Sequence, residues 1–199
     1  TFNLDEYVGL PGTDPHSYRH FMDQHLFARI NIDRRNTHLP DGCAPDLDAE
    51  CRQYEALIAE CGGIDLQELG IGASGHIGFN EPLSALRSRT RAKALAPETL
   101  AQNAPLFTPP ARMPSRGITM GVGTILDCRQ CVLLATGAHK AEIVARAVEG
   151  PITAMVSASA LQLHPHCQVV VDEAAAGDLQ GQNYYRWIFA NEPEWEPFR

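Results

Sequence analysis

The sequence is poor in lysine and has no long hydrophobic run. Only Lys93 and Lys140 are lysines, against fourteen arginines. No stretch approaches the roughly 20 consecutive apolar residues that a membrane-spanning helix needs, and no signal peptide is visible, so we expect no membrane partner. The formal net charge of −8 argues against a nucleic-acid partner, because an acidic surface repels phosphate polyanions. A small anionic substrate is still compatible, since backbone N–H groups and one or two cations can bind it locally.

The six cysteines do not have the regular spacing of a disulfide framework. The chain is also too long to need covalent staples, so we expect reduced thiols and a cytoplasmic location. Cys128 and Cys131 have the spacing of a metal or redox pair, but the sequence has no second pair of this kind. Cys131 also begins an apolar run that is typical of a buried strand. We therefore expect a structural role for this pair, and we predict no metal site.

The length and composition indicate one globular domain over residues 1–199. The chain has 44% hydrophobic and 20% charged residues, and a chain of this size buries roughly 70% of its unfolded surface. It begins with Thr1-Phe2-Asn3-Leu4-Asp5 and not with Met. This start resembles the end of a strand, so we expect an amino-terminal piece to be missing.

Strand and helix signals alternate along the chain. Apolar runs bounded by Gly, Pro or Asp predict buried strands at residues 64–71, 131–136 and 167–171. Helical periodicity predicts helices at residues 17–29, 49–61, 140–150 and 157–163. The alternation predicts an α/β fold with a doubly wound, largely parallel sheet and flanking helices, Rossmann-like and three-layered, whose first strands are missing.

Three local signals refine this prediction. Asp48 is the expected N-cap of the second helix, and Gly62-Gly63 is expected to end it. Residues 83–114 are polar and contain prolines without a clear period, so we expect a loop with a mobile flap. Ligands of such folds bind beyond the carboxyl ends of the strands, so we expect the site in the loops after Ile71 and Thr136.

The first of these loops combines glycines with a histidine. Residues 70–78 read Gly-Ile-Gly-Ala-Ser-Gly-His-Ile-Gly, and Glu81 follows three residues later. Glycines such as Gly75 let backbone N–H groups approach an anionic ligand. A neutral imidazole accepts a proton near neutral pH, and a nearby carboxylate orients it. A lone loop histidine is more often structural, but Glu81 and the glycines favour a catalytic interpretation of His76.

Two further positions are candidates for the site. Asp5 and Glu6 stand at the expected end of the first strand, where a carboxylate can act as a general base; solvated turn residues are an equal alternative. Lys140 follows Gly137 at a predicted strand-to-helix junction, where a cation and a helix N-terminus together bind phosphate. A surface lysine needs no function, but a lysine in so arginine-rich a chain mildly favours this role.

Together these segments resemble the glucosamine-6-phosphate deaminase family over nearly the whole chain, lacking its amino-terminal part. The continuation Phe79-Asn80-Glu81-Pro82 distinguishes this family from the sister 6-phosphogluconolactonases, whose glycine–histidine loop continues differently. The other matching stretches are residues 2–10, Ser17-Tyr18 with Phe21-Met22, 75–78, 88–91, 119–124, Thr136-Gly137 with Lys140, and 161–165.

The resemblance implies an activity and a role for each candidate residue. Glucosamine 6-phosphate would be converted to fructose 6-phosphate and ammonia, without a metal or organic cofactor. His76 would open the sugar ring with the help of Glu81, and Asp5 would carry the C2 proton to C1. Lys140 would hold the phosphate, with Gly75 and Gly137 in the binding loops. The partner would be a small amino-sugar phosphate, and a homo-oligomer is compatible with the resemblance.

The chain also departs from the family pattern. Ser74 stands where the family usually has Asp or Asn, and a hydroxyl can hydrogen-bond to His76 but supplies no charge. Pro105 stands near the place of a phosphate-binding arginine of enteric members. The family's first strands and their phosphate loop would lie upstream of Thr1. Two alternatives therefore stay open: a 6-phosphogluconolactonase-like hydrolase, and a non-catalytic sugar-phosphate sensor on the same fold.

The resemblance finally suggests an allosteric site. Ser84, Arg91 and Lys93 match positions that bind N-acetylglucosamine 6-phosphate in some hexameric members of the family. A solvated basic stretch formed by Arg87, Arg89 and Arg91 is the simpler alternative.

Overall fold

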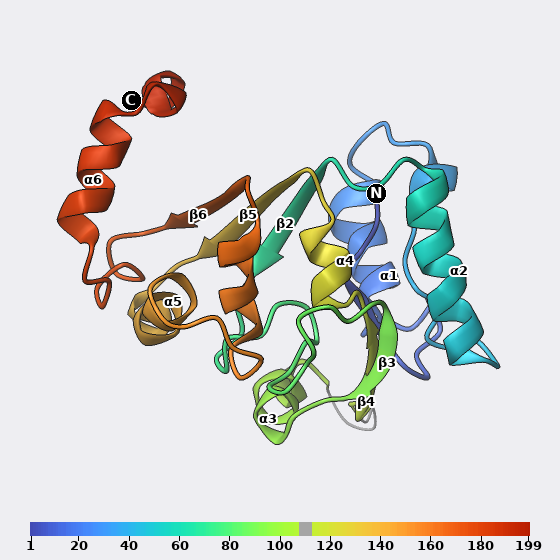
Figure 1. Cartoon of the computed structure of the whole chain (residues 1–199). Helices are drawn as coiled ribbons and strands as arrows, with labels where there is room; N and C mark the ends of the chain where they lie inside the picture. The colour runs from blue at the N-terminus through green and yellow to red at the C-terminus, as the bar shows by residue number, and fades with distance from the viewer. Residues whose placement is uncertain (108–112) are drawn as a thin grey trace.

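The computed structural model describes residues 1–107 and 113–199, and its centre is a parallel sheet (Figure 1). The strands are β2 (Leu66–Gly70), β5 (Gln130–Ala135) and β6 (Cys167–Val171), in the order β2-β5-β6. All three lie where the apolar runs predict them. Helices alternate with these strands along the chain, so the α/β class and the parallel sheet are confirmed.

A second, antiparallel sheet was not predicted from the sequence. It contains β1 (Asp5–Tyr7), β3 (Arg91–Ala94) and β4 (Arg116–Thr119), in the order β1-β4-β3. Strands of three or four residues are too short to show a period, which explains the omission. The expected loop at residues 83–114 in fact contains β3 and helix α3 (Pro97–Asn103), and its residues 108–112 lie outside the described part of the chain.

The helices agree with the predictions in place but differ in detail. The segment predicted at 17–29 is α1 (Tyr18–Met22) followed by a π-helical turn, Asp23–Phe27. The segment at 157–163 is a 3-10 helix. The remaining helices are α2 (Leu47–Glu60), α4 (Val122–Leu126), α5 (Ala141–Val148) and α6 (Gln182–Asn191), with short 3-10 turns at 34–36, 104–106, 138–140 and 193–198.

The start of α2 corrects one prediction, and its end confirms another. Its N-cap is Asp46, whose carboxylate accepts hydrogen bonds from the backbone N–H groups of Asp48 and Ala49. Asp48 therefore lies inside the first turn, where an acidic side chain also favours the helix dipole. Gly62 and Gly63 both have φ of +86°, a conformation that favours glycine, and they end the helix as expected.

The buried side chains form two clusters that lie on either side of the loop after β2. The larger one includes Leu69, Leu133 and Val144, from the parallel sheet and α5. The smaller one is mainly aromatic and contains Tyr7, Phe79, Leu95 and Phe107. The loop carrying residues 71–79 contributes Ile77 to the first cluster and Phe79 to the second. Its backbone is therefore held from both sides by apolar packing.

The carboxylate of Glu55 on α2 fixes a neighbouring loop. It accepts hydrogen bonds from the backbone N–H of Thr90 at 2.8 Å, and from the hydroxyls of Thr90 and Thr124 at 2.5 and 2.6 Å. Arg89 adds a charged contact at 2.5 Å. Burial would raise the pKa of Glu55, but these donors outweigh it and hold the pKa below its usual value.

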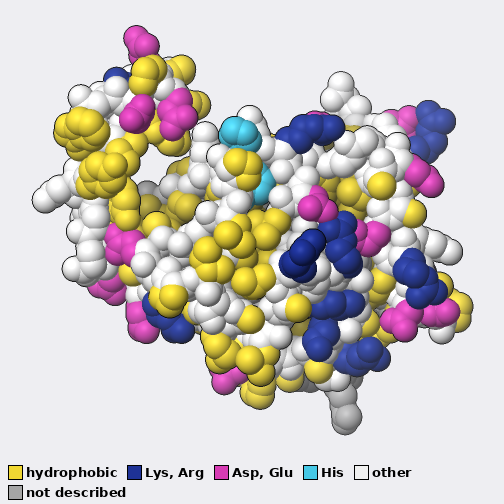
Figure 2. Space-filling view, in the orientation of Figure 1, with side chains coloured by type: hydrophobic (Ala, Val, Ile, Leu, Met, Phe, Trp, Pro, Cys, Tyr) yellow, Lys and Arg dark blue, Asp and Glu magenta, His cyan; other side chains and the backbone are white. Residues whose placement is uncertain are grey.

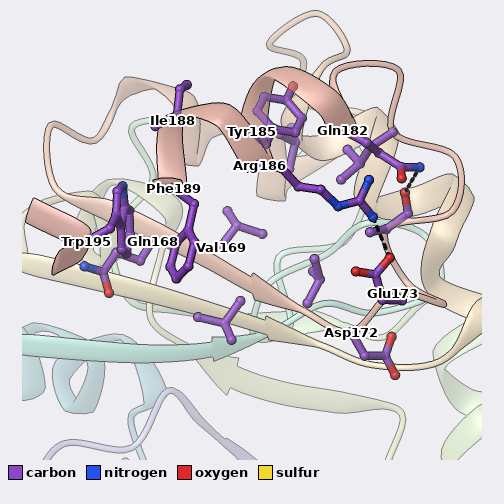
Figure 3. Close-up of a pocket in the computed structure, with 15 residues that line it drawn as sticks. Gln168, Val169, Asp172, Glu173, Gln182, Tyr185, Arg186, Ile188, Phe189 and Trp195 are labelled. Atoms are coloured by element: carbon purple, nitrogen blue, oxygen red, sulfur yellow. Dashed lines mark hydrogen bonds and ion pairs between the residues drawn. The ribbon is translucent and has the colours of Figure 1, made fainter. Parts of the chain in front are cut away.

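Helix α6 stands away from the rest of the molecule, at the left of Figure 1. A groove of about 540 Å³ lies between it and β6, lined by side chains such as Val169, Ile188, Phe189 and Trp195 (Figure 3). The ion pair Arg186–Glu173, at 2.7 Å, joins the helix to the segment after β6. None of the candidate site residues lines this groove.

The surface is divided by type of side chain. In Figure 2, Lys and Arg side chains gather over the half of the molecule that carries β3 and β4 in Figure 1, whereas hydrophobic side chains gather toward α6. Arg87, Lys93 and Arg116 are exposed members of the basic half. Within the described residues, the helices are all too short or too polar to cross a membrane.

The Glu55 contacts generate a prediction about stability. Glu55→Ala leaves the buried Thr90 backbone N–H without its acceptor, so we expect a loss of about 3 kcal/mol in the free energy of unfolding, measured by urea denaturation. Glu60→Ala, at an exposed position of the same helix, is the matched control and should cost less than about 0.5 kcal/mol. Equal losses in both variants would contradict the assigned role of Glu55.

Candidate active site

The glycine–histidine loop begins directly after β2 and closes on itself. The N–H of Gly72 donates to the carbonyl of His76, and the N–H of Gly75 donates to the carbonyl of Gly72, each at 2.9 Å. Gly75 has φ of +82°, and a Cβ there would lie 2.6 Å from Val156. These two N–H groups therefore stabilise the turn, and the role of Gly75 in ligand binding stays a prediction.

The imidazole of His76 lies against Gly72. A Cβ built on Gly72 would be 2.1 Å from two atoms of the ring, so only glycine leaves room for it. The loop thus positions the imidazole by removing a side chain from the residue beneath it. Gly72 is therefore needed for the space that His76 occupies, while the approach of loop N–H groups to an anionic ligand stays a prediction.

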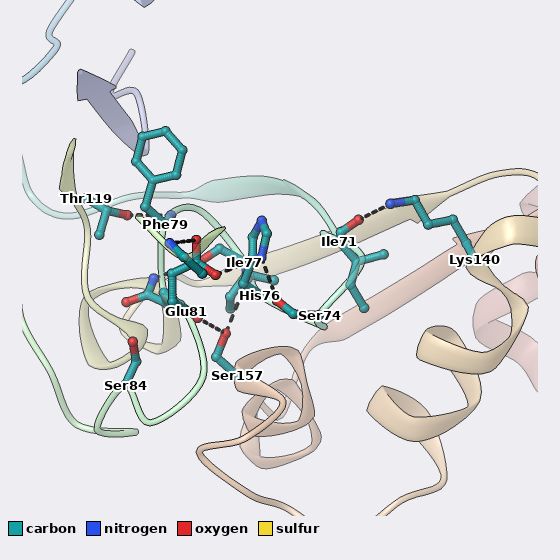
Figure 4. A network of polar contacts seen from close by, with 12 residues as sticks. Ile71, Ser74, His76, Ile77, Phe79, Glu81, Ser84, Thr119, Lys140 and Ser157 are labelled. Carbon is teal, nitrogen blue, oxygen red and sulfur yellow. Dashed lines mark hydrogen bonds and ion pairs between the residues drawn. The ribbon is translucent and has the colours of Figure 1, made fainter. Parts of the chain in front are cut away.

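Two side-chain oxygen atoms contact the Nδ1 atom of His76, as Figure 4 shows. Ser74 Oγ lies 2.9 Å from Nδ1, and Glu81 Oε2 lies 3.3 Å from it. A carboxylate at this distance favours the tautomer that carries the proton on Nδ1. The Nε2 atom is then the basic nitrogen, and it is the one that can take a proton from a ligand.

The Glu81 carboxylate is held by the start of α3. Its Oε1 accepts the backbone N–H of Ala96 at 3.2 Å, and the Thr99 side chain also contacts it. Oε2 is buried and faces His76 without a well-aligned hydrogen-bond partner. Burial would raise the pKa of Glu81, but the contacts with His76 and Thr99 outweigh it, so the pKa lies below its usual value and the group is charged near neutral pH.

Asn80 connects this loop to the antiparallel sheet. Its side-chain Nδ2 donates to the carbonyls of Ile77 and Met120, both at 2.8 Å, and its Oδ1 accepts from Arg91 at 2.8 Å. The hydroxyl of Ser157 donates to its backbone carbonyl at 2.7 Å. Asn80 is fully buried, so each of these bonds satisfies a polar group that is removed from water.

Asp5 approaches the same loop from the antiparallel sheet. A Cβ on Gly78, two residues after His76, would lie 3.5 Å from Asp5 Oδ2 and 2.8 Å from Thr119 Oγ1. Asp5 pairs with Thr119 across β1 and β4. Burial, with a smaller contribution from the charge of Glu6, raises the pKa of Asp5 to about 7. A carboxyl with this pKa can exchange a proton at neutral pH.

The position of Asp5 in its strand corrects the sequence-based prediction. We expected Asp5 and Glu6 to end a strand, but Asp5 begins β1. Before β1, Phe2 forms an isolated parallel β-bridge with His38. The antiparallel pairing of β1 with β4 then begins at Asp5. Glu6 is not available as a base, because its buried carboxylate accepts the backbone N–H groups of Tyr7, Tyr18 and Arg19 at 2.8–3.0 Å.

Lys140 lies beside the beginning of the His76 loop, whereas the backbone N–H of Gly137 is already hydrogen-bonded. The Lys140 ammonium donates to the carbonyl of Ile71 at 2.7 Å, and partial burial lowers its pKa. The N–H of Gly137 donates to the carboxylate of Asp172 at 3.0 Å, and Gly137 has φ of +89°. Any phosphate contact from the Gly137 N–H would first have to displace Asp172.

Of the three residues suggested as an allosteric site, Ser84 and Arg91 are in contact. Arg91 donates to Ser84 Oγ at 3.0 Å as well as to Asn80, and burial lowers the pKa of Arg91. Lys93 lies two residues further along β3, with an exposed side chain. Pro105 lies in the short 3-10 turn that follows α3.

The structure thus brings Ser74, His76 and Glu81 into contact and places Asp5 against the same loop. Sequence reasoning missed the supporting residues Asn80, Thr99 and Thr119. Asn80 could have been suspected, because it lies inside the specific Phe-Asn-Glu-Pro string, but Thr99 gave no signal. Among the described residues, no group of three or more His, Cys, Asp or Glu side chains could hold a metal ion.

An α/β domain with a histidine–carboxylate pair and a half-buried aspartate at the start of a strand fits an enzyme that works by proton transfer. A family model described as "Glucosamine-6-phosphate isomerases/6-phosphogluconolactonase" matches residues 2–171. The chain belongs to this family.

Curated relatives and solved structures support the assignment. The chain is 52% identical, over 98% of its length and 75% of the relative's, to a glucosamine-6-phosphate deaminase of Pseudarthrobacter chlorophenolicus. It is 53% identical, over 94% and 71%, to one of Cutibacterium acnes. A solved glucosamine-6-phosphate deaminase described as monomeric has a TM-score of 0.86 at 43% identity, over 89% of this chain and 74% of that one.

More distant structures share the fold alone. A 6-phosphogluconolactonase of Trypanosoma brucei has a TM-score of 0.64 at 18% identity, over 89% of this chain and 73% of that one. The resemblance to glucosamine-6-phosphate deaminases, noted from the sequence, is therefore confirmed, and the fold is one that lactonases also use.

The packing of His76 on Gly72 generates a prediction. Gly72→Ala should push the imidazole away from Ser74 and Glu81, so the pKa of Glu81 should rise, as measured by carboxyl-carbon NMR titration. The matched control is Gly70→Ala, where a Cβ meets nothing within 4 Å, and it should leave the Glu81 pKa unchanged. An unchanged Glu81 pKa in Gly72→Ala would show that the ring is not held in this way.

Proposed function

We propose that this chain is a glucosamine-6-phosphate deaminase, which converts glucosamine 6-phosphate and water to fructose 6-phosphate and ammonia. The observation that carries the proposal is the meeting of two differently tuned carboxyls, Asp5 and Glu81, at the His76 loop. An aldose–ketose isomerisation needs one group to open the ring and another to move a proton between C2 and C1. The relatives named above as deaminases support the same activity.

In this proposal His76 acts first. Nε2 takes the proton of the C1 hydroxyl, the bond between C1 and the ring oxygen breaks as the C1 aldehyde forms, and the imidazolium gives the proton to the ring oxygen, which becomes the C5 hydroxyl. The charged Glu81 stabilises the imidazolium through Nδ1, at 3.3 Å, and the Ser74 hydroxyl can accept the same Nδ1 proton at 2.9 Å. Glu81 has this role because its pKa lies below the usual value and it stays ionised.

Asp5 acts second. Its carboxylate takes the proton from C2, and an enediol-type intermediate forms that still carries the amino group on C2. The same carboxyl, now protonated, delivers the proton to C1. The resulting imine at C2 is hydrolysed by water, and ammonia leaves. A pKa of about 7 suits this task, because the group must both accept and return a proton at neutral pH.

Lys140 is the proposed phosphate ligand. Its ammonium lies at the carbonyl of Ile71, at the start of the His76 loop, and it can turn toward a phosphate held at the same strand ends. The net reaction hydrolyses a carbon–nitrogen bond, although its central step is an isomerisation. A homo-oligomer stays a prediction, and one solved relative is described as monomeric.

The activity is tested by assaying the purified protein for ammonia release from glucosamine 6-phosphate, alongside hydrolysis of 6-phosphogluconolactone. We expect ammonia and fructose 6-phosphate in equal amounts, and no lactone hydrolysis above background. Lactone hydrolysis alone would support the hydrolase alternative. Binding of the amino sugar by calorimetry without ammonia release would support the sensor alternative.

Asp5→Asn tests the proton-transfer step. The amide keeps the shape of the side chain but cannot accept the C2 proton, so kcat should fall by about 10²–10⁴-fold with little change in KM. Glu6→Gln is a poor control, because the Glu6 carboxylate accepts backbone N–H groups at the start of α1. The control is therefore Asp14→Asn, in a turn outside the candidate site. An equal loss of substrate affinity and kcat in Asp5→Asn would make Asp5 a structural residue.

The raised pKa of Asp5 also predicts a pH profile. The base must be ionised in the free enzyme, and its folded-state pKa is about 7. The acid limb of kcat/KM should therefore bend near pH 7 and fall about tenfold for each pH unit below it. A limb that bends near pH 4, the ordinary range of an aspartate, would contradict the assignment of Asp5 as the base.

Ser74→Asp tests the departure from the family pattern. A carboxylate at this position would add a negative charge beside Nδ1 of His76 and stabilise the imidazolium form. We therefore expect kcat to rise about fivefold. Ser74→Ala removes the hydrogen bond and should lower kcat. If Ser74→Asp gives no gain, Glu81 alone already supplies the charge that His76 needs.

A further inference from the structure

Three cysteines lie together at the amino-terminal ends of the central strands, away from the His76 loop. Cys131 and Cys167 are in-register partners on β5 and β6. Adjacent strands lie about 4.8 Å apart, which is inside the Cα separation of roughly 4.4–6.8 Å that a disulfide spans. Cys128 precedes β5, and its thiol is in hydrogen-bond contact with that of Cys131.

The three thiols differ in their access to solvent. Cys128 and Cys131 are buried, whereas Cys167 is half-buried. Cys167 lines a cavity of about 240 Å³, whose other walls include Leu133, Ala147 and Leu161. A small reagent that enters this cavity therefore meets the sulfur of Cys167 before that of Cys131.

Access to the cavity, and not the pKa, distinguishes Cys167 from Cys128. Contact with Cys131 lowers the pKa of Cys167 below its usual value, and contact with Cys131 and His164 lowers the pKa of the buried Cys128 to about 6. A lowered pKa increases the thiolate fraction, and the thiolate is the reactive form. His164, which also lines the cavity, donates from Nε2 to the carbonyl of Cys128 at 2.8 Å, and the same Nε2 lies 3.5 Å from Cys128 Sγ.

We propose that Cys167 is a covalent modification site for small disulfides, with Cys131 as the thiol that resolves the adduct. The Cys167 thiolate attacks one sulfur of the small disulfide RSSR, which forms a mixed disulfide and releases RS⁻. The Cys131 sulfur then attacks Cys167 Sγ and releases the second RS⁻. The two protons lost from the protein thiols go to these leaving groups. The protein is thus oxidised by two electrons, RSSR is reduced to two RSH, and β5 is bonded to β6.

This site is independent of the proposed deaminase activity. The cysteines lie at the starts of β5 and β6, whereas Gly137 and Asp172 follow the ends of the same two strands. Metal binding does not explain the cluster, because no group of three metal-ligating side chains is found among the described residues. The sequence spacing directed attention to the Cys128–Cys131 pair, but the structure places the accessible thiol on the neighbouring strand.

The experiment uses oxidised glutathione as the probe and intact-mass and peptide mass spectrometry as the readout. The background is Cys43→Ser/Cys61→Ser, which removes the two exposed cysteines outside the cluster. In this background we expect two free thiols to be lost, two equivalents of glutathione to be released, and a Cys131–Cys167 cross-linked peptide to appear. In the added variant Cys131→Ser, we expect one stable glutathione adduct on Cys167.

Two controls make the result decisive. Cys51→Ser removes a buried cysteine outside the cluster and should leave the cross-link unchanged. Cys167→Ser should abolish both adduct and cross-link, and its circular dichroism must match that of the background. A Cys128–Cys131 disulfide, an adduct that persists in Cys167→Ser, or no reaction in a folded background protein would each overturn the proposal.

Discussion

The site depends on one buried side-chain amide, that of Asn80. It hydrogen-bonds to the carbonyl of Ile77 in the His76 loop and to the carbonyl of Met120 after β4. The loop belongs to the parallel sheet and β4 to the antiparallel one, so this amide joins the two sheets at the place where the candidate residues meet. The N–H of Phe79 makes a parallel connection to Thr119 Oγ1 at 3.1 Å. These bonds act together with the packing of Tyr7 against Phe79 to keep the carboxylate of Asp5 near the backbone of Gly78.

The two sheets place Asp5 and Glu81 in environments that shift their pKa values in opposite directions. Asp5 gains no compensating donor that outweighs its burial, so its pKa rises to about 7. Glu81 is also buried, but the contacts with His76 and Thr99 lower its pKa. One fold thus supplies a carboxyl that can exchange protons and a carboxylate that stays charged, a division of roles that environment and not residue type determines. This difference in pKa requires α3, because the N–H of Ala96 and the side chain of Thr99 contact the Glu81 carboxylate.

The sequence predicted the parallel strands and the His76 loop because both have strong local signals. Apolar runs of five to eight residues predicted β2, β5 and β6, and glycines around a histidine indicated the loop. The antiparallel sheet could not be predicted, because its strands have three or four residues, and β1 pairs with β4 across more than 100 positions, as Glu6 and Ile118 do. For the same reason Asp5 was placed at the wrong end of its strand. The contact between Gly137 and Asp172 was also hidden, since a 35-residue separation gives no local pattern.

With serine at position 74, the carboxylate beside Nδ1 of His76 is that of Glu81. A hydroxyl can accept the Nδ1 proton of His76 or donate to Nδ1, so by itself it does not select a tautomer. Glu81 Oε2 can only accept when it is ionised, and its lowered pKa keeps it ionised. The tautomer with a free, basic Nε2 therefore depends on Glu81 alone, and through it on the N–H of Ala96 and the side chain of Thr99. In the proposed mechanism, the identity of residue 74 adjusts how strongly the imidazolium is stabilised, while the contacts from α3 to Glu81 determine which nitrogen acts as the base.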